Sequence, residues 1–416
     1  MAKPALVKPF AGWRPRADVV SQVAAPPYDV LNREEAAEMA AGNPHSFLHV
    51  SKAEIDLPAD LDPYDPKVYA TAKANYAKLK ADGMIAQDEA PCFYVYRLIW
   101  QGRAQTGIVA AASVEAYDSD RIKKHEFTRP AKENDRTEFA WALKAHSGPV
   151  FLTYRKDQAI DTLVAEICKQ DPVYDFDAGD GIQHTLWVCS DAGQNDKLEA
   201  AFDALPAVYV ADGHHRSAAA SRVHARTVEE GLGQADEEAP HNRFLSVLFP
   251  DDQMRILDYN RVVKDLGDLD EAAFMAEVKK RFDVTPTAEA CSPKAHGSFG
   301  MYLGGKWYSM TLKADMAVAD DPVKRLDVSL LSDFLLEPIL GISDPRRDPR
   351  IDFVGGIRGM QGLEKRVDSG EMKVAFSLFA TTMDDLMAVA DSGQVMPPKS
   401  TWFEPKLRDG LVVQAF

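Results

Sequence analysis

The sequence predicts a mixed α+β fold built from more than one domain. At 416 residues the chain is long enough for two or three domains of roughly 150 residues each. Short apolar runs typical of strands are interspersed with segments whose apolar residues recur at helical spacing. They do not alternate as strictly as in a barrel, and no repeat of fixed period is visible. We therefore predict a core in residues 1–250 and a further α/β region in residues 251–416, which could pack with the core as one unit.

The composition bounds the location and the partners of the protein. The four cysteines are widely separated and form no Cys-x-x-Cys pair, so neither a disulfide framework nor a zinc ribbon is expected. No signal peptide and no apolar stretch near the ~20 residues of a membrane helix is visible. A formal net charge of -16 opposes non-specific attraction to nucleic acid or anionic lipid. We expect a cytoplasmic protein that binds phosphate only in a locally positive pocket.

The N-terminal third begins with proline-rich loops and continues into helices and a hairpin. The pair Pro26-Pro27 forces extended backbone, which places Tyr28 and Asp29 on a rigid loop. We expect a helix over 32–41 that is capped by Asn32, and a longer one over 65–82. Its buried face would carry Val68, Ala72, Tyr76 and Leu79. Two strands, 93–100 and 106–114, flank Gln101-Gly102-Arg103 and predict a β-hairpin.

The rest of the chain alternates between strand-like and helix-like segments. Residues 121–136 are highly charged and interrupted by Pro130, and residues 229–241 are expected to form a surface loop. Strands are expected at 150–154, 184–189, 207–211, 244–249, 300–303, 306–312, 373–379 and 412–415. Helices are expected at 161–169, 196–204, 215–226, 271–282, 328–340 and 383–391.

The segment with the clearest chemical meaning joins the strand 207–211 to the helix that follows it. The strand ends at Asp212-Gly213, and the helix starts within a few residues, so its free backbone N–H groups and its dipole favour an anion. Gly213 permits a tight turn and close approach by a ligand. His214, His215 and Arg216 add donors at the same place, and the arginine fork matches phosphate oxygens. The turn therefore predicts an electropositive seat for a phosphate group.

Two other interpretations of this turn remain open. Asp212 could be only a helix cap in an ordinary strand-helix connection. Two histidines and an arginine at one turn are unusual for mere packing, and site residues gather on such loops. His214 or His215 with Asp212 could also bind a metal, although no recognised metal-ligand spacing accompanies them.

The charged segment 121–136 supplies the ionisable groups that acid-base chemistry needs. Its ordinary interpretation is a solvated loop, which we weigh equally against a functional one, because Phe127 and Pro130 could anchor it. Candidate roles are general base for Glu126, with His125 beside it, and phosphate or carboxylate clamp for Arg136. Phosphoryl transfer needs mainly positioning and charge neutralisation. A Mg²⁺ ion would bridge the phosphates, with Asp29 or Asp212 as candidate ligands.

The run from Val210 to Ala218 resembles the signature of the ParB/sulfiredoxin superfamily, whose sulfiredoxin members have Gly-Gly-Cys-His-Arg at this turn. The resemblance implies that the turn and helix bind nucleotide phosphates, with Gly213, His214, His215, Arg216 and Ser217 as contacts. His214 stands where sulfiredoxin has its reactive cysteine, which argues against thiol chemistry. Free serine kinases of the same superfamily have a similar Asp-Gly-His-His-Arg element.

Over nearly its full length the chain also resembles a family known as domain of unknown function 1015. The features that carry this resemblance are Lys8-Pro9-Phe10 with Arg14, Pro26 to Val30, Asn43-Pro44 with Phe47-Leu48, His125-Glu126 with Thr128, Asp212 to Arg216, Met396 to Thr401, and Pro405-Lys406-Leu407. The combination is specific. It names relatives of the chain without naming a reaction.

The sequence therefore favours a kinase that transfers phosphate from ATP or ADP, with Mg²⁺, to the hydroxyl of a small metabolite. Free L-serine is the specific expectation, and Glu126, His125 and Asp212 are the expected catalytic groups. One alternative is a nucleotide-binding regulator without turnover, whose DNA-bound form the net acidity disfavours. Another is a metal-dependent hydrolase that uses His125, His214 and His215.

Overall fold

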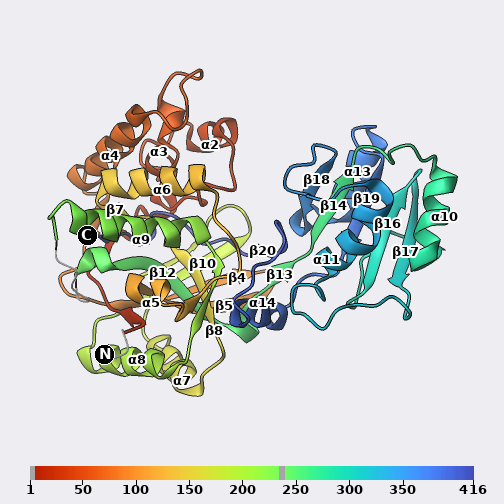
Figure 1. The fold of residues 1–416 in the computed structure, drawn as a ribbon. Helices are drawn as coiled ribbons and strands as arrows, with labels where there is room; N and C mark the ends of the chain where they lie inside the picture. Colours follow the sequence, from red (N-terminus) through yellow and green to blue (C-terminus); the bar gives the residue numbers. More distant parts are fainter. Residues whose placement is uncertain (1–4, 234–238) are drawn as a thin grey trace. The chain divides into compact units, whose positions relative to one another are not determined.

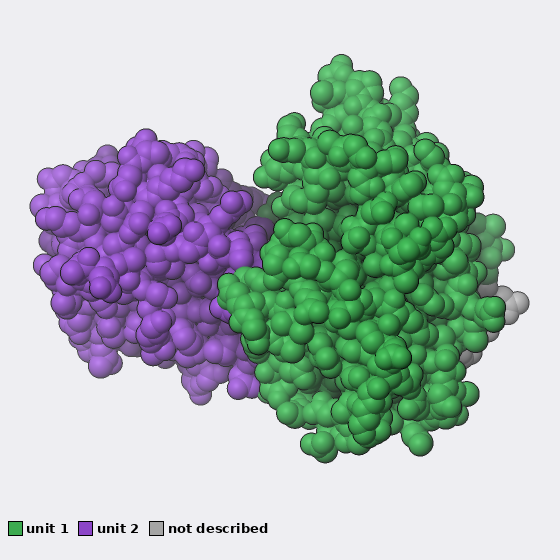
Figure 2. Space-filling model, turned by 180° about the vertical axis from the view of Figure 1, so that it is seen from behind, with its two compact units in different colours: residues 1–254, 405–416 green, residues 255–404 purple. Residues whose placement is uncertain are grey.

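The chain divides into two compact units. The computed structural model describes residues 5–233 and 239–416. Unit 1 comprises residues 1–254 and 405–416, and unit 2 comprises residues 255–404 (Figure 2). The sequence predicts a single region over residues 251–416, whereas the last residues of the chain return to unit 1. They do so because β21 (Gln414–Ala415) pairs with β7 (Ala145–His146) of unit 1.

Unit 1 is built on a large mixed sheet. Its strand order is β6-β11-β8-β12-β5-β4-β10-β9, and the short β1 also pairs with β5. The strands are β1 (Val7–Lys8), β4 (Phe93–Trp100), β5 (Arg103–Ser113), β6 (Ile122–Lys123), β8 (Val150–Tyr154), β9 (Tyr174–Asp177), β10 (Ile182–Cys189), β11 (Val208–Asp212) and β12 (Arg243–Pro250). β8 runs parallel to β12 and antiparallel to β11, so the sheet is neither purely parallel nor a simple meander. The mixed α+β class predicted from the sequence is confirmed.

Helices cover both faces of this sheet (Figure 1). On one face α9 (His214–Glu229) packs with α6 (Pro130–Leu143), and α6 packs in turn against α4 (Pro66–Ala81). On the other face lie α7 (Gln158–Ile167) and α8 (Ala192–Ala204). The short helices of unit 1 are α1 (Val20–Val23), α2 (Arg33–Ala40), α3 (Leu48–Ser51) and α5 (Val114–Asp118), and a further two-stranded sheet pairs β2 (Trp13–Pro15) with β3 (Ile85–Gln87). One apolar cluster joins the sheet to α7 and α8, and another joins the N-terminal helices to α6.

Local sequence signals specify several of these elements. Asn32 caps α2 in a reciprocal pair with Glu35, and the Asp65 side chain caps α4. The buried face of α4 is the predicted one, consisting of Val68, Ala72, Tyr76 and Leu79. The hairpin is also confirmed: Gln101 and Gly102 both have positive φ, as a two-residue turn between β4 and β5 requires.

The charged segment 121–136 is more ordered than a solvated loop. Arg121 is buried and donates to the carbonyls of Asp203 and Leu205, and Ile122 and Lys123 form β6 beside β11. Pro130 does not interrupt the segment but begins α6, where the missing N–H of proline costs nothing. Phe127 is 67% exposed and therefore does not anchor the segment.

Unit 2 has an antiparallel sheet of its own, in the order β15-β17-β16-β19-β14-β18. Its strands are β14 (Tyr259–Val263), β15 (Phe282–Thr287), β16 (Ser298–Leu303), β17 (Lys306–Leu312), β18 (Ile351–Gly355) and β19 (Val374–Leu378), with β13 (Ile256–Leu257) and β20 (Trp402–Phe403) paired separately. Its helices are α10 (Glu271–Arg281), α11 (Asp327–Leu331), α12 (Glu337–Leu340), α13 (Gly359–Asp368) and α14 (Met383–Asp391). The helix predicted over 328–340 contains a π-helical turn at Ser332–Leu336.

The loop predicted at 229–241 lies partly outside the described residues, since 234–238 are not described; Pro240–Asn242 form a 3-10 turn. None of the described helices combines the length and the apolar character that crossing a membrane requires.

Candidate functional site

A β-bulge and a left-handed glycine shape the turn between β11 and α9. The pairing of β11 with β8 slips between Val210 and Asp212, which is the kind of irregularity that redirects side chains beside functional sites. Gly213 has φ 95° and ψ 27°, a conformation that other residues rarely adopt. A Cβ atom at this position would lie 3.3 Å from Arg216 Nε and 3.4 Å from Val150 Cα. Only glycine lets the chain turn here without strain or crowding.

The turn presents the first amides of α9. The amides of Arg216 and Ser217 donate to the Gly213 carbonyl, and the amide of Gly213 donates to Asp212 Oδ1 at 2.8 Å. The amides of His214 and His215 stand at the first two helical positions, where helix geometry offers no partner within the helix. The positive end of the helix dipole is directed to the same point. Together they suit an oxyanion.

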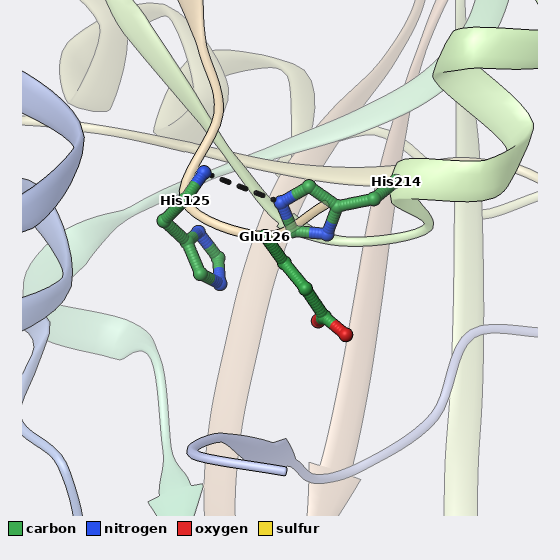
Figure 3. Close-up of side chains that lie close together, drawn as sticks. All are labelled: His125, Glu126 and His214. Atoms are coloured by element: carbon green, nitrogen blue, oxygen red, sulfur yellow. Dashed lines mark hydrogen bonds between the residues drawn. The ribbon is translucent and has the colours of Figure 1, made fainter. Parts of the chain in front are cut away.

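The two segments that the sequence singles out meet at His125 and His214 (Figure 3). Their rings pack edge to face with centroids 4.5 Å apart, and the His125 amide points to His214 Nε2 at 3.5 Å. His125 is 1% exposed, and neither of its ring nitrogens has a hydrogen-bond partner of normal geometry among the described residues. Burial lowers the pKa of His125 to about 4. Burial and the neighbouring His125 ring lower the pKa of His214 below its ordinary value, so both rings are neutral near pH 7.

Glu126 places an exposed carboxylate beside these two rings. One ligand atom from each of His125, Glu126 and His214 lies within 4.8 Å of the other two. Neutral imidazole nitrogens and a carboxylate are suitable ligands for a divalent transition metal. The same carboxylate is also placed to accept a proton from a bound hydroxyl group.

Asp212 is held in its charged form by a lysine from the C-terminal segment of unit 1. Lys406 Nζ donates to Asp212 Oδ2 at 2.8 Å. Burial by itself would raise the pKa of Asp212, but the cations of Lys406 and Arg216 outweigh burial and hold the pKa below its ordinary range. Both oxygens of Asp212 thus have partners, because Oδ1 accepts from the Gly213 amide.

The remaining residues predicted at the turn face different surroundings. His215 Nε2 accepts from the Arg129 amide at 3.0 Å, and burial lowers the pKa of His215. Ser217 is fully buried and its hydroxyl donates to the His214 carbonyl, so this side chain faces the protein and not a ligand. The expectation that Ser217 contacts the cofactor has no support from this geometry.

Arg216 also departs from the arrangement expected from the sequence. Its Nη1 donates to the Pro149 carbonyl, and its Nη2 lies 3.8 Å from Asp29 Oδ2. It therefore makes its contacts in a neighbouring pocket, whose lining includes neither His125 nor Glu126. Arg136 lines the same pocket, with its guanidinium carbon 4.0 Å from the centre of the Tyr28 ring. The two predicted anion-binding arginines are together, in a place that the sequence does not indicate.

Three further residues of the site carry no local signal of their role. Lys406 is 194 positions from Asp212, Asp409 lines the arginine pocket, and the Arg129 amide positions His215. Lys406 stands in one of the motifs that resemble the 1015 family, but nothing in that motif points to Asp212. Only the return of residues 405–416 to unit 1 brings Lys406 and Asp409 to these positions.

Comparison with family models identifies a family, and comparison with solved structures gives distant structural neighbours. The model of the family described as "Protein of unknown function (DUF1015)" matches residues 7–329. No curated protein matches in sequence. A free serine kinase in complex with AMP is 15% identical, with a TM-score of 0.35, over 73% of this chain and 89% of that one. A conserved hypothetical protein from Pyrococcus furiosus is 15% identical, with a TM-score of 0.34, over 73% and 93%. SbnI with a C-terminal truncation, from Staphylococcus aureus, is 11% identical, with a TM-score of 0.36, over 72% and 85%.

Proposed function

We propose, from the premise that the chain belongs to the DUF1015 family, that it is a nucleotide-dependent kinase acting on a small hydroxyl compound. The specific acceptor that we propose is free L-serine. One observation carries the proposal: the first two amides of α9 adjoin two neutral, buried imidazoles and the exposed carboxylate of Glu126. The resemblance of the turn to phosphate-binding turns of the ParB/sulfiredoxin superfamily agrees with this arrangement.

The start of α9 would bind the terminal phosphate of ATP or ADP. The amides of His214 and His215 donate to its oxygens, and the glycine at 213 allows the phosphate to approach the backbone. The neutral His125 and His214 rings can donate or accept a hydrogen bond without adding charge. In a molecule of net charge -16, this local arrangement would provide the attraction that the overall charge does not.

Glu126 would act as the general base. The acceptor hydroxyl oxygen forms a bond to the terminal phosphorus while the bond from phosphorus to the bridging oxygen breaks. The electron pair of that bond stays on the nucleotide, which leaves as ADP or AMP, and the hydroxyl proton passes to Glu126. His125 and His214 lie beside the carboxylate and would orient the hydroxyl group of the acceptor.

Magnesium fits the folded site poorly as an ion held by the protein. Asp212 already accepts from Lys406 and from the Gly213 amide, and Asp29 lies beside the Arg216 guanidinium. Binding to these carboxylates would have to displace cations. We therefore propose that Mg²⁺ enters with the nucleotide phosphates, as it commonly does, and we assign no step to Asp29 or Asp212 as ligands.

The decisive experiment is a search for a phosphorylated product. The purified protein is incubated with ATP or ADP, Mg²⁺ and a panel of hydroxy amino acids, and products are identified by mass spectrometry. We expect phosphoserine, and a loss of about 10²–10⁴ in rate for Glu126→Gln. Glu89→Gln, which alters an exposed carboxylate in a bend, is the matched control. Nucleotide binding without any consumption would instead indicate a regulatory protein.

A metal-dependent hydrolase is the second candidate, favoured by the cluster of His125, Glu126 and His214. In that case these three side chains would bind a divalent transition metal, which would activate a water molecule. Metal analysis of the purified protein separates the candidates. Stoichiometric zinc, iron or manganese that is lost in His125→Ala would support the hydrolase, and its absence would leave the kinase.

The four cysteines are free thiols. Free thiols are usual in a reducing compartment, and they support the cytoplasmic location that we propose.

A further inference from the structure

A second pocket in unit 1 lies beside the first turn of α9 and is lined by charges of both signs. Its charged and polar residues are Arg136, Arg216, Asp409, Tyr28, His146 and Ser147. The enclosed space in the pocket is about 30 Å³, and its mouth opens to solvent. A space of this size holds about two water-sized groups, so a larger ligand would place only its charged end inside. Small residues on the facing helices, Ala140 of α6 and Ala219 of α9, leave this space open.

The positive side of the pocket has donors without full partners. Arg216 Nε is buried and has no hydrogen-bond partner among the described residues, and Nη2 lies 3.8 Å from Asp29 Oδ2. Arg136 is held by Asp135 at 2.9 Å and lies against the Tyr28 ring. Arg136 is therefore neutralised within the protein, whereas Arg216 retains capacity for an anionic group.

The negative side of the pocket is Asp409. This side chain is 2% exposed, and its Oδ1 atom has no hydrogen-bond partner among the described residues. Burial and the neighbouring Asp29 carboxylate raise the pKa of Asp409 to about 7, against the opposing effect of Arg216. A buried carboxyl oxygen without a donor is costly, typically about 1–3 kcal/mol, and calls for an explanation.

Gly148 keeps the space in front of Asp409 open. A Cβ atom on Gly148 would lie 3.0 Å from Asp409 Oδ1 and 3.4 Å from Arg216 Cδ. The unsatisfied oxygen and the arginine stem thus border the same small volume. The Arg216 side chain and the Asp409 carboxyl group therefore lie close enough together for one small ligand to contact both.

We infer that this pocket binds the charged end of a free α-amino acid, with Arg216 on its carboxylate and Asp409 on its ammonium group. A guanidinium fork matches a carboxylate, and an ammonium group supplies the donors that Asp409 Oδ1 lacks. The inference rests on the proposed function, because it identifies what holds the acceptor. It predicts that recognition depends on the zwitterion and not on the hydroxyl group.

The test is a calorimetric comparison of ligands with the full chain in the absence of nucleotide. L-serine is compared with glycine, which keeps the zwitterion, with ethanolamine, which lacks the carboxylate, and with 3-hydroxypropionate, which lacks the ammonium group. We expect serine and glycine to bind, and the other two to bind about a hundredfold more weakly or not at all, since buried groups would be left unpaired. Equal affinity for all four, or no binding of serine and glycine at millimolar concentration, would overturn the inference.

Variants locate the binding. Asp409→Asn should weaken serine binding by about a hundredfold and change 3-hydroxypropionate binding little, because only the ammonium contact is lost. Asp18→Asn, which alters a carboxylate 67% exposed in its pair with Arg16, is the matched control. If Asp409→Asn does not fold, Gly148→Ala tests the same volume, and unchanged serine affinity in that variant contradicts the assignment.

The binding assay also separates this inference from the kinase proposal. Zwitterion-dependent binding without phosphorylated product would retain the pocket and reject the kinase. Phosphorylation of 3-hydroxypropionate as efficient as that of serine would retain the kinase and reject the pocket.

Discussion

Lys406 donates to Asp212 across 194 positions of the chain, with 2.8 Å between Nζ and Oδ2. The pair joins the C-terminal return of unit 1 to the turn that opens α9. The Lys406 and Asp212 side chains are only 21% and 30% exposed, so solvent screens this pair less than an ordinary surface pair. Four predictions follow from this pair and from its neighbours.

Removing the Lys406 charge should destabilise the turn. In Lys406→Met the partly buried Asp212 carboxylate loses its counter-ion, and we expect a fall of about 1–3 kcal/mol in the free energy of unfolding, measured with urea. Lys156→Met is the matched control, because its pair with Asp252 is roughly half exposed and should contribute less than the Lys406 pair. Equal losses in the two variants would mean that the Asp212 pair behaves as a surface pair.

His125 should make the protein sensitive to acid. Burial lowers its pKa from 6.5 to about 4, so between these pH values the unfolded state binds more protons than the folded state. Stability therefore rises with pH across this window and is lost on acidification. The contribution of His125 is about 3 kcal/mol by linkage. In His125→Gln the difference in unfolding free energy between pH 6.5 and pH 4 should shrink by about that amount. An unchanged difference would show that His125 is not buried in its neutral form.

Gly213→Ala should cost more than the same change at another left-handed glycine. Positive φ alone costs roughly 1–2 kcal/mol for a residue with a side chain. At Gly213 the new methyl group would also crowd Arg216 Nε and Val150 Cα, whereas at Gly83, with φ 65°, nothing lies within 4 Å. Urea unfolding of Gly213→Ala and Gly83→Ala should differ by about 1 kcal/mol or more. Nucleotide affinity should fall only in Gly213→Ala.

Glu126→Gln should separate chemistry from binding. The amide keeps the shape of the side chain but cannot accept the hydroxyl proton, so the turnover rate should fall while nucleotide affinity changes less than about threefold. Steady-state kinetics and nucleotide titration of the same preparation measure both quantities. A parallel loss of rate and affinity would indicate that Glu126 holds the ligand.

Much of the fold of unit 1 could be read from local patterns. The cap at Asn32, the buried stripe of α4 and the turn at Gln101-Gly102 each depend on residues within a few positions of one another. Where a sequence pattern was compatible with two local structures, packing selected one of them. Pro130 fits both the end of a loop and the first residue of a helix, and only the contacts of α6 with α4 and α9 select the helix.

The sequence indicated part of the candidate site. The turn at Gly213 and the importance of the His125 and Glu126 segment have sequence signals, and the structure brings these segments into contact. No signal in the sequence indicates where the Arg216 side chain points. A side chain on the first turn of a helix can face either neighbour of that turn, and the carbonyl of Pro149 and the carboxylate of Asp29 draw this one into the second pocket.

The sequence by itself determined the mixed α+β class, the family, the positions of most helices and strands, and the glycine turn at the start of α9. The fold class, the element positions and the turn depend on backbone preferences and apolar spacing within short stretches, whereas the family is identified by a combination of motifs along the chain. The tertiary structure alone decided that His125 meets His214, that Lys406 neutralises Asp212, and that Arg136, Arg216 and Asp409 share a pocket. These partners come from distant parts of the chain, and the burial and charge that set their chemistry arise only when the sheet and its helices pack together.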